Sequence, residues 1–289
     1  MSFKQVTIIG TGLIGGSLGL ALRKRHLVSR VIGCDRAPVL KRAKDCGAIE
    51  KGATSIAEAV RGSDLIVLAT PVITIIDLLE RIGPSLPPRT LVTDAGSTKA
   101  AIVQRAAKSF GRSASQRFLA GHPMAGKESA GVEFADADLF EGAAWLFTPL
   151  PRQNPQTGLC GEFVQCIEKI GARVAFLDPA EHDRFCAWIS HLPQMISTAL
   201  AATLVDEFGP DAPFLDIGGR ALRDLTRISG SPYSMWRDIA ITNKKNLADA
   251  LHKLEQRLAH IRENLDSREL AAEFERAHEL RKVKSQKSD

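Results

Sequence analysis

The order of apolar and polar residues divides the chain into two regions of different periodicity. Through residue 177, short apolar runs end in Gly, Asp or Thr, and they include QVTIIG, RVIGCD, DLIVLAT and TLVTDAG. Runs that are apolar throughout, rather than at alternate positions, are typical of parallel strands buried on both faces. The segments between them have helical spacing and lie at Ile14–His26, Pro38–Cys46, Val72–Ile82 and Lys99–Phe110. This alternation predicts an α/β domain with a Rossmann-type, doubly wound parallel sheet over residues 1–177.

Two later runs, AAWLFT and ARVAFLD, are expected to add strands to this sheet, with a helix from about Thr157 to Ile170 between them. From Asp178 the strand pattern stops. Apolar side chains then recur at helical spacing in three stretches, which lie at Phe185–Leu204, Trp236–Leu265 and Leu270–Ala277. Pro193 is expected to kink the first of these helices. The sequence predicts an all-helical domain over residues 178–289, and such long amphipathic helices favour a homodimer.

The composition argues against several classes of protein. The N-terminal apolar run is too short for a signal peptide, and no stretch approaches the roughly 20 apolar residues that span a bilayer. The five cysteines are odd in number and form no CxxC pair, which argues against a disulfide framework or structural zinc. We therefore expect a cytoplasmic protein without a metal site and without a membrane partner.

The net charge of +5 raises the question of a nucleic-acid partner. The basic residues are spread along the chain, apart from the tail RKVKSQKSD, so no such partner is expected. A small anionic substrate suits a mildly basic protein equally well.

A glycine motif follows the first predicted strand. The segment IIGTGLIGGSLG places Gly10, Gly12 and Gly15 in the order G-x-G-x-x-G. The first glycine permits a tight turn, the second lets the backbone approach a pyrophosphate, and the third allows close packing of helix and strand. The helix N-terminus, at Leu13 and Ile14, would then face the anion. Since a strand precedes the motif and a helix follows it, we predict a dinucleotide site rather than a turn without a ligand.

The residue that ends the second predicted strand bears on the choice of dinucleotide. This residue, Asp35, lies twenty positions after Gly15. A carboxylate there accepts hydrogen bonds from ribose hydroxyls and repels a 2′-phosphate, which favours NAD. The neighbouring Arg36 would tolerate that phosphate, so NADP is the alternative. LATPV ends another strand, and its Thr70 and Pro71 are expected to line the nicotinamide half of the site.

The segment AGHPMAGKE contains a lone histidine, His122, between Gly121 and Pro123. The proline drives the residue before it to an extended backbone, so the imidazole should project from a loop at the edge of the sheet. Oxidation of an alcohol requires a group that takes the hydroxyl proton, and a histidine with a pKa of about 6.5 suits that task. We predict that His122 is the catalytic base rather than a buried structural histidine.

The segment TDAGSTKAAI has the composition of a strand end followed by the start of a helix. Ser97 is equally suited to cap that helix and to hydrogen-bond both His122 and the nicotinamide amide at the carboxyl edge of the sheet. The sequence alone leaves the two roles open.

Five segments occur in the order found in one known family. They are GTGLIGGSLG, TDAGSTK, GHPMAGKESAGVE, EHDRFCAWISHLPQ and LRDLTRISGSPYSMWRDIAITNKKN. Through these segments the chain resembles the prephenate/arogenate dehydrogenase family of tyrosine biosynthesis, and the resemblance extends from Gly10 to about Leu265. It implies an N-terminal nucleotide-binding domain, a C-terminal helical dimerisation domain and an active site between them.

The resemblance also implies roles for individual residues. His122, in the matched GHP motif, would take the proton of the C4 hydroxyl, and Ser97 would orient it and contact the nicotinamide. Arg227, in the matched LTRIS motif, would bind a substrate carboxylate. Further contacts would come from Ser190 and His191 in SHLP, from Glu128 as a gate paired with Arg227, and from Trp236 reaching in from the partner subunit.

Four of these assignments have a structural alternative. Arg227 could instead form an ion pair with Asp224 on a helix surface, and His191 could be a core histidine. Trp236 could belong to the apolar stripe that it begins, and Glu128 could simply be solvated.

The chain departs from the family pattern at two positions. Gln194 stands where many members have a second histidine, and Lys127 stands where a small hydroxyl residue is common. Both are expected near the substrate side chain, so they bear on the choice between prephenate and arogenate and on feedback by tyrosine.

The resemblance as a whole implies oxidative decarboxylation of prephenate to 4-hydroxyphenylpyruvate, with hydride transfer to NAD. The alternative is an arogenate-specific or dual-specificity cyclohexadienyl dehydrogenase, with either NAD or NADP as its cofactor. A non-catalytic dinucleotide-binding sensor is the alternative from a different class.

Overall fold

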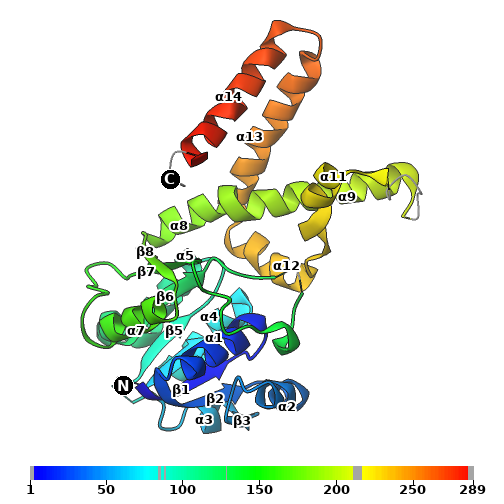
Figure 1. Ribbon diagram of the computed structural model, residues 1–289. Helices are drawn as coiled ribbons and strands as arrows, with labels where there is room; N and C mark the ends of the chain where they lie inside the picture. Colours follow the sequence, from blue (N-terminus) through cyan, green and yellow to red (C-terminus); the bar gives the residue numbers. More distant parts are fainter. Residues whose placement is uncertain (1–2, 84–85, 88, 128, 211–216, 286–289) are drawn as a thin grey trace. The chain divides into compact units, whose positions relative to one another are not determined.

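The computed structural model describes residues 3–83, 86–87, 89–127, 129–210 and 217–285. Eight strands form one sheet (Figure 1), in the order β3-β2-β1-β4-β5-β6-β7-β8. Their bounds are β1 Phe3–Ile9, β2 Val28–Cys34, β3 Lys51–Ala53, β4 Leu65–Leu68, β5 Leu91–Asp94, β6 Phe118–Pro123, β7 Ala144–Thr148 and β8 Arg173–Phe176. Neighbouring strands are parallel, except for the antiparallel pair β6 and β7. The predicted doubly wound sheet is confirmed.

Helices cover both faces of this sheet (Figure 1), and each face has its own apolar core. One core includes side chains of α1 (Leu13–Lys24), α2 (Ala37–Asp45) and α7 (Gly158–Lys169), and the other includes α4 (Val72–Ile82) and α5 (Ala100–Phe110). Successive strand residues alternate between the two cores. In β4, Leu65 and Val67 belong to the first core, whereas Ile66 and Leu68 belong to the second. This alternation explains why the strand sequences are apolar throughout. The short helices among the described residues of this part of the chain are α3 (Ile56–Ala59), η2 (Gly111–Ser113), α6 (Ala114–Arg117) and η3 (Val132–Phe134).

Strand β6 changes partners along its length. Its first residues pair with β5, with Phe118 opposite Val92, and its last residues pair with β7, with His122 opposite Leu146. The prediction that His122 lies in a loop was therefore wrong. The strand that pairs with it comes from a later part of the chain, so the composition around His122 does not reveal it. Gly121 is required here, because a Cβ at this position would lie 2.7 Å from the indole nitrogen of Trp145 on β7.

After β8 the described residues contain helices and no further strand. Asp178 caps α8 (Pro179–Cys186), since its carboxylate accepts a hydrogen bond from the backbone N–H of Ala180 at 2.8 Å. A π-helical turn, η4 (Ala187–His191), joins α8 to α9 (Leu192–Phe208), with Pro193 in the first turn of α9. The helix is thus irregular just before Pro193, where a kink was predicted, because the proline has no N–H to donate to the preceding turn.

The remaining helices are α11 (Arg220–Thr226), η5 (Arg227–Gly230), α12 (Tyr233–Thr242), α13 (Lys244–Glu263) and α14 (Arg268–Ser285). The stripe that was predicted to run from Trp236 to Leu265 is broken at Asn243, whose side-chain amide donates to the backbone oxygen of Asp183 at 2.7 Å. The chain separates into a unit that ends at Lys244 and a second that begins at Lys245. Within the first unit, α8 packs on α5 and β7, and α12 packs on α4.

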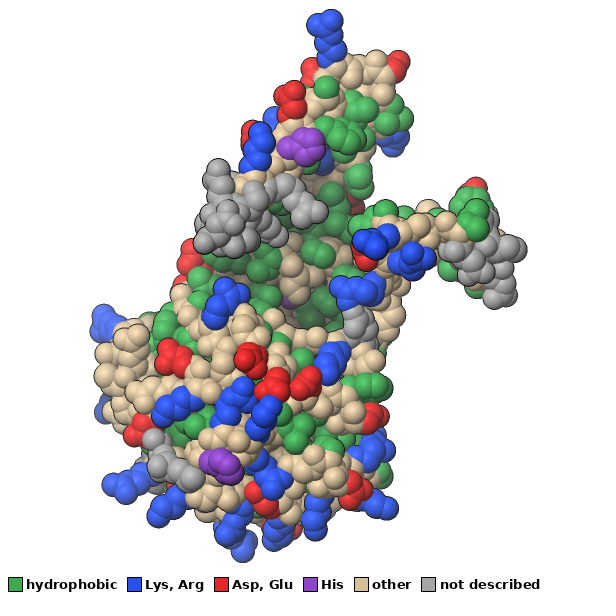
Figure 2. Space-filling model, in the orientation of Figure 1, with side chains coloured by type: hydrophobic (Ala, Val, Ile, Leu, Met, Phe, Trp, Pro, Cys, Tyr) green, Lys and Arg blue, Asp and Glu red, His purple; other side chains and the backbone are tan. Residues whose placement is uncertain are grey.

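None of the helices in the described residues has the length and apolar character needed to cross a membrane. On the face shown in Figure 2, acidic and basic side chains are interspersed over the part of the molecule around β1, β2 and β3. The positive net charge therefore does not gather into one continuous basic patch on that face.

Candidate active site

A cavity of about 630 Å³ lies in the first unit, where the carboxyl ends of β1, β4, β5 and β6 meet the segment η4 and the start of α12. Open α/β sheets bind ligands at this edge. Predicted site residues that line it are Gly12, Leu13, Ile14, Thr70, Pro71, Ser97, His122, Lys127, Ser190 and Trp236. The cavity therefore brings together the residues predicted for the cofactor, the base and part of the substrate site.

The glycine loop between β1 and α1 has the shape that a dinucleotide requires. Gly10 has φ +92°, and a Cβ there would lie 2.5 Å from the backbone oxygen of Ala69. A Cβ on Gly15 would collide with the backbone oxygen of Gly10. Gly12 is the N-cap of α1 and has open space around the position of its missing Cβ. A phosphate can therefore approach the backbone at the start of the helix.

Asp35 follows β2 and is tied to the same loop. Its Oδ2 accepts a hydrogen bond from the backbone N–H of Thr11 at 2.8 Å, and its Oδ1 accepts one from the backbone N–H of Arg36 at 2.7 Å. A carboxylate has about four acceptor sites, so the group keeps capacity for ribose hydroxyls. Asp35 and the exposed Arg36 are not part of the cavity lining among the described residues.

Thr70 follows β4 and lines the cavity. Its Oγ1 is buried and has no hydrogen-bond partner in the part of the chain that the structure describes. A buried hydroxyl in this state is a group that a bound ligand can satisfy.

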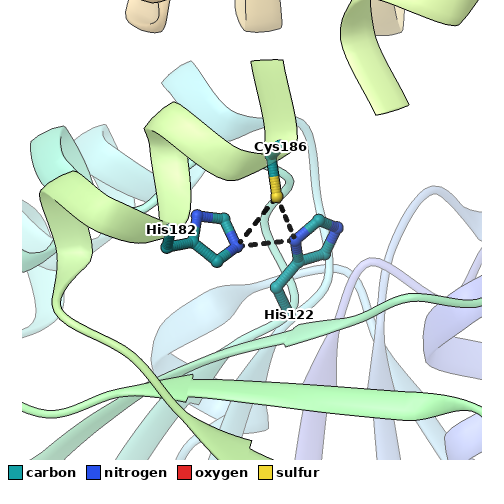
Figure 3. A group of neighbouring side chains, drawn as sticks. All are labelled: His122, His182 and Cys186. Carbon is teal, nitrogen blue, oxygen red and sulfur yellow. Dashed lines mark hydrogen bonds between the residues drawn. The ribbon is translucent and has the colours of Figure 1, made fainter. Parts of the chain in front are cut away.

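His122 is 8% exposed, and its ring has a specific neighbour. Figure 3 shows its Nδ1 directed at His182 and Cys186 of α8, while the other ring nitrogen points away from both. Nδ1 lies 2.9 Å from His182 Nε2 and 4.0 Å from Cys186 Sγ. Burial, followed by the proximity of His182 and Lys99, holds the pKa of His122 well below 6.5. The imidazole is therefore neutral at neutral pH and able to accept a proton.

His182 in turn contacts Asp183. Its Nδ1 lies 2.9 Å from Asp183 Oδ1, and the carboxylate also accepts hydrogen bonds from the backbone N–H groups of Lys99 (2.7 Å) and Ala100 (3.0 Å). Asp183 thus caps the N-terminus of α5 from a distant part of the chain. The capping role considered for Ser97 is wrong, because Lys99 is the N-cap residue of α5 and Asp183 satisfies the N–H groups at this end.

His182 and Asp183 were not among the predicted site residues. A signal was present in the sequence, because His182 and Cys186 are four residues apart in EHDRFC and therefore share a helix face. The face alone does not reveal that β6 brings His122 against it.

His122, His182 and Cys186 are also residue types that bind transition metals, and their candidate ligand atoms all lie within 4.8 Å of one another. The two ring nitrogens are 2.9 Å apart, which is a hydrogen-bond distance. Two nitrogens on one tetrahedral zinc ion, each at about 2.0–2.1 Å, would be separated by roughly 3.3 Å. The buried ammonium of Lys99 also lies close enough to interact electrostatically with His122 and His182. The geometry favours a hydrogen-bonded chain over a metal centre.

Ser97 shares the cavity with His122. In the described part of the chain its hydroxyl makes no hydrogen bond to the imidazole, whose Nδ1 instead faces His182 and Cys186. The predicted contact of Ser97 with the nicotinamide stays a prediction, and its position in the cavity is consistent with it.

Of the other predicted substrate residues that the structure describes, three line the cavity and three do not. Ser190, Lys127 and Trp236 line the cavity, and the Trp236 that does so belongs to the same chain. The implied contribution of Trp236 from a partner subunit stays a prediction. Its indole nitrogen is buried and without a hydrogen-bond partner among the described residues. Glu128 lies outside the described residues.

His191, Gln194 and Arg227 are not part of the described cavity lining. His191 is fully buried, its Nδ1 lies 3.2 Å from the side-chain amide of Asn243, and burial lowers its pKa to about 4. Gln194 is also buried, and its amide donates to the backbone oxygen of Ile228 at 2.9 Å. Arg227 is exposed at the start of η5, directly before Ile228. Gln194 therefore helps to hold the segment that carries Arg227.

A doubly wound sheet, a glycine loop at a helix N-terminus and a neutral buried histidine on one cavity define a class of protein. It is the class of dinucleotide-dependent dehydrogenases, in which a base removes a proton while hydride moves to the cofactor.

Comparison with known proteins specifies the family. Residues 18–176 match the model of the prephenate dehydrogenase nucleotide-binding domain, and residues 178–279 match that of the prephenate dehydrogenase dimerisation domain. Prephenate dehydrogenase of Lactococcus lactis subsp. cremoris is 32% identical over 97% of this chain and 77% of the relative. The chain therefore belongs to the prephenate dehydrogenase family of oxidoreductases, as the sequence resemblance implied.

Two solved structures show the same fold over nearly the whole length. Prephenate dehydrogenase from A. aeolicus, in complex with hydroxyphenyl propionate and NAD+, has a TM-score of 0.86 and 32% identity, with 100% of this chain and 99% of that chain covered. Arogenate dehydrogenase from Synechocystis has a TM-score of 0.76 and 28% identity, with 99% and 100% covered.

Proposed function

We propose that this enzyme oxidises and decarboxylates prephenate to 4-hydroxyphenylpyruvate, with NAD as the hydride acceptor. The observation that carries the proposal is that one cavity holds part of the glycine loop, Thr70, His122 and Lys127. Membership of the prephenate dehydrogenase family and the A. aeolicus relative with bound NAD+ support it.

The residues of the cofactor site fit a dinucleotide. The open space at Gly12 admits a pyrophosphate, and Asp35 is available to ribose hydroxyls. The buried hydroxyl of Thr70, which has no partner among the described residues, is available at the other end. When bound there, NAD supplies a hydride acceptor. Asp35 favours NAD over NADP because its charge repels a 2′-phosphate.

His122 moves the proton of the reaction. Its neutral ring accepts the proton of the C4 hydroxyl through Nε2 as hydride leaves that carbon and the C4 carbonyl forms. The bond to the ring carboxylate then breaks, CO2 leaves, and its electron pair makes the ring aromatic. His122 can return its proton to the resulting phenolate oxygen. Restored aromaticity makes the sequence effectively irreversible.

The charge of the cavity favours prephenate over arogenate. Lys127 lines it, and the described lining residues include no Asp or Glu. Prephenate is a dianion, whereas arogenate carries an ammonium group that would gain from an acidic neighbour. Arg227 is proposed to bind one carboxylate, since a guanidinium matches it in a bidentate geometry. The arogenate or dual-specificity alternative is supported by the likeness to the Synechocystis enzyme.

The proposed assembly is a homodimer through the helical region, residues 178–289. Among the residues that the structure describes, most of the large exposed apolar side chains lie between Phe185 and Leu280, including Ile189, Phe208 and Phe274. Such surface favours burial against a second copy. Light scattering of the purified protein should give the mass of two chains, and a monomer mass would contradict this.

All five cysteines are free, which suits the proposed location in the reducing cytoplasm.

A steady-state assay with prephenate and arogenate, each with NAD and NADP, tests the proposed function. We expect the highest kcat/KM with prephenate and NAD, because the cavity offers a lysine to the second carboxylate and Asp35 repels the extra phosphate of NADP. A higher kcat/KM with arogenate would replace the proposed substrate. The absence of NAD or NADP reduction with either substrate would refute the activity.

The low pKa of His122 has a consequence for the pH dependence. A base must be unprotonated to act, so a pKa held well below 6.5 moves the acidic limb of the profile to lower pH. We expect the acidic limb of kcat/KM, which reports the free enzyme, to lie below pH 6.5. Initial rates between about pH 5 and pH 9 measure it. A limb at or above 6.5 would show that burial does not control this proton.

A further inference from the structure

The side chains behind His122 form a chain of hydrogen bonds whose direction follows from chemistry. Asp183 accepts two backbone N–H groups at the start of α5, and its Oδ1 lies 2.9 Å from His182 Nδ1. A carboxylate can only accept hydrogen bonds, so His182 Nδ1 must carry a proton and donate it.

The remaining steps follow from the neutral state of both rings. Burial lowers the pKa of His182 and of His122, so each neutral imidazole has one N–H and one lone pair. With its proton on Nδ1, His182 presents a lone pair at Nε2. His122 Nδ1, at 2.9 Å, must then be the donor of the bond between the rings. The lone pair of His122 is left on Nε2, which points away from both neighbours in Figure 3.

Cys186, the third side chain of the group, does not change the direction of these hydrogen bonds. Cys186 Sγ lies 3.5 Å from His182 Nε2, and burial together with Asp183 raises the pKa of the thiol to about 12. Cys186 therefore stays a thiol and offers a weak donor to the same nitrogen.

We propose that His182, held by Asp183, is a positioning residue that fixes His122 in the tautomer with Nδ1 protonated and the basic lone pair on Nε2. The positioning role in catalysis rests on the proposed function, whereas the tautomer of His122 follows from the geometry. The acceptor at His182 Nε2 prevents rotation of the His122 ring. It also faces the positive charge that forms on His122 when the substrate proton arrives. The arrangement is similar to a catalytic triad, in which a third group orients the base. Here His182 lies between the base, His122, and the carboxylate of Asp183.

A spectroscopic measurement tests the tautomer without any substrate. The full-length enzyme with 15N-labelled histidine is recorded by NMR above pH 7, and the His122 signals are assigned by their loss in His122→Asn. We expect a protonated, pyrrole-type Nδ1 and an unprotonated, pyridine-type Nε2. A proton on Nε2 would overturn the proposal. This result is independent of whether prephenate is the substrate.

Two substitutions test the positioning role. His182→Phe removes the acceptor, and we expect kcat to fall about a hundredfold, at the lower end of what a positioned base contributes. His182→Gln can place an amide oxygen where Nε2 was, and kcat should stay within about tenfold of the wild type. The KM for the substrate and the affinity for NAD, from fluorescence titration, should change little in both. His278→Gln, on an exposed part of α14, is the matched control.

Three outcomes would contradict the role of His182. They are an unchanged kcat in His182→Phe, equal losses of kcat in the Phe and Gln variants, and a loss of NAD affinity that parallels the loss of kcat. The last would indicate a merely structural residue. If His182→Phe does not fold, the wild-type NMR spectrum and His182→Gln decide the question. If neither substrate is turned over by the wild type, the proposed function fails while the tautomer is still measured.

Discussion

Replacing His122 with asparagine should lower kcat by about a thousandfold, while the affinity for NAD stays close to that of the wild type. A positioned base contributes roughly 10²–10⁴ to the rate, and the asparagine amide has no basic nitrogen at neutral pH. Asparagine can still donate to His182 Nε2 from near the position of Nδ1, so the buried contact of 2.9 Å has a replacement. The measurement is steady-state turnover of prephenate together with an NAD titration.

The pH profile of the His122→Asn variant provides a control for this result. Any residual activity of His122→Asn should lack the acidic limb that lies below pH 6.5 in the wild type, because the titrating group is gone. His278→Asn, at an exposed position, should leave both rate and profile as they were. A kcat within tenfold of the wild type would remove His122 from the role of base and return it to the status of a buried histidine.

The fold was largely predictable because its signals are local. Each buried parallel strand needs apolar residues on both faces, and each covering helix needs an apolar stripe, so both leave a pattern in a short stretch of chain. The helix predicted at Val72–Ile82 has those bounds in the structure, and that predicted at Lys99–Phe110 begins one residue later. The glycine loop was predictable for the same reason, since strand, turn and helix are contiguous.

The surroundings of His122 were not predictable, because they depend on contacts between distant segments. Its strand pairs with β7, which begins more than twenty residues later, and its ring meets His182, sixty residues away. Ser97 illustrates the same difficulty. The helix cap that its sequence context suggested is made by Asp183, on a helix far along the chain. Only the resemblance to a family pointed to Arg227 and Trp236, and of these Trp236 lines the cavity.

Lys99, the last residue of the segment TDAGSTK, is another residue whose surroundings come from distant parts of the chain. Its replacement is expected to have a large effect on stability. Lysine is rarely buried, yet the side chain of Lys99 is fully buried and pairs with the fully buried Asp94. Its ammonium also donates to the backbone oxygen of Gly121 at 2.6 Å, next to His122. The pair thus joins the end of β5 to β6 at Gly121, the residue before the proposed base.

Replacing Lys99 with methionine should lower the free energy of unfolding by about 3–5 kcal/mol. Methionine fills a similar volume, but it leaves the carboxylate of Asp94 buried without its cation, and breaking one side of a buried pair has a cost of this size. Thermal or denaturant unfolding of the variant measures it. The control is Lys51→Met, which breaks an exposed pair with Glu58 and should cost about 0–1 kcal/mol.

The double variant separates loss of the pair from loss of volume. In Asp94→Asn combined with Lys99→Met no buried charge remains at this position, and the asparagine oxygen can still accept the backbone N–H of Gly96 that Asp94 accepts at 2.8 Å. We therefore expect the double variant to be more stable than Lys99→Met alone. If the two substitutions instead add, the cost comes from packing around the lysine stem, and the ion pair does not hold the ends of β5 and β6 together.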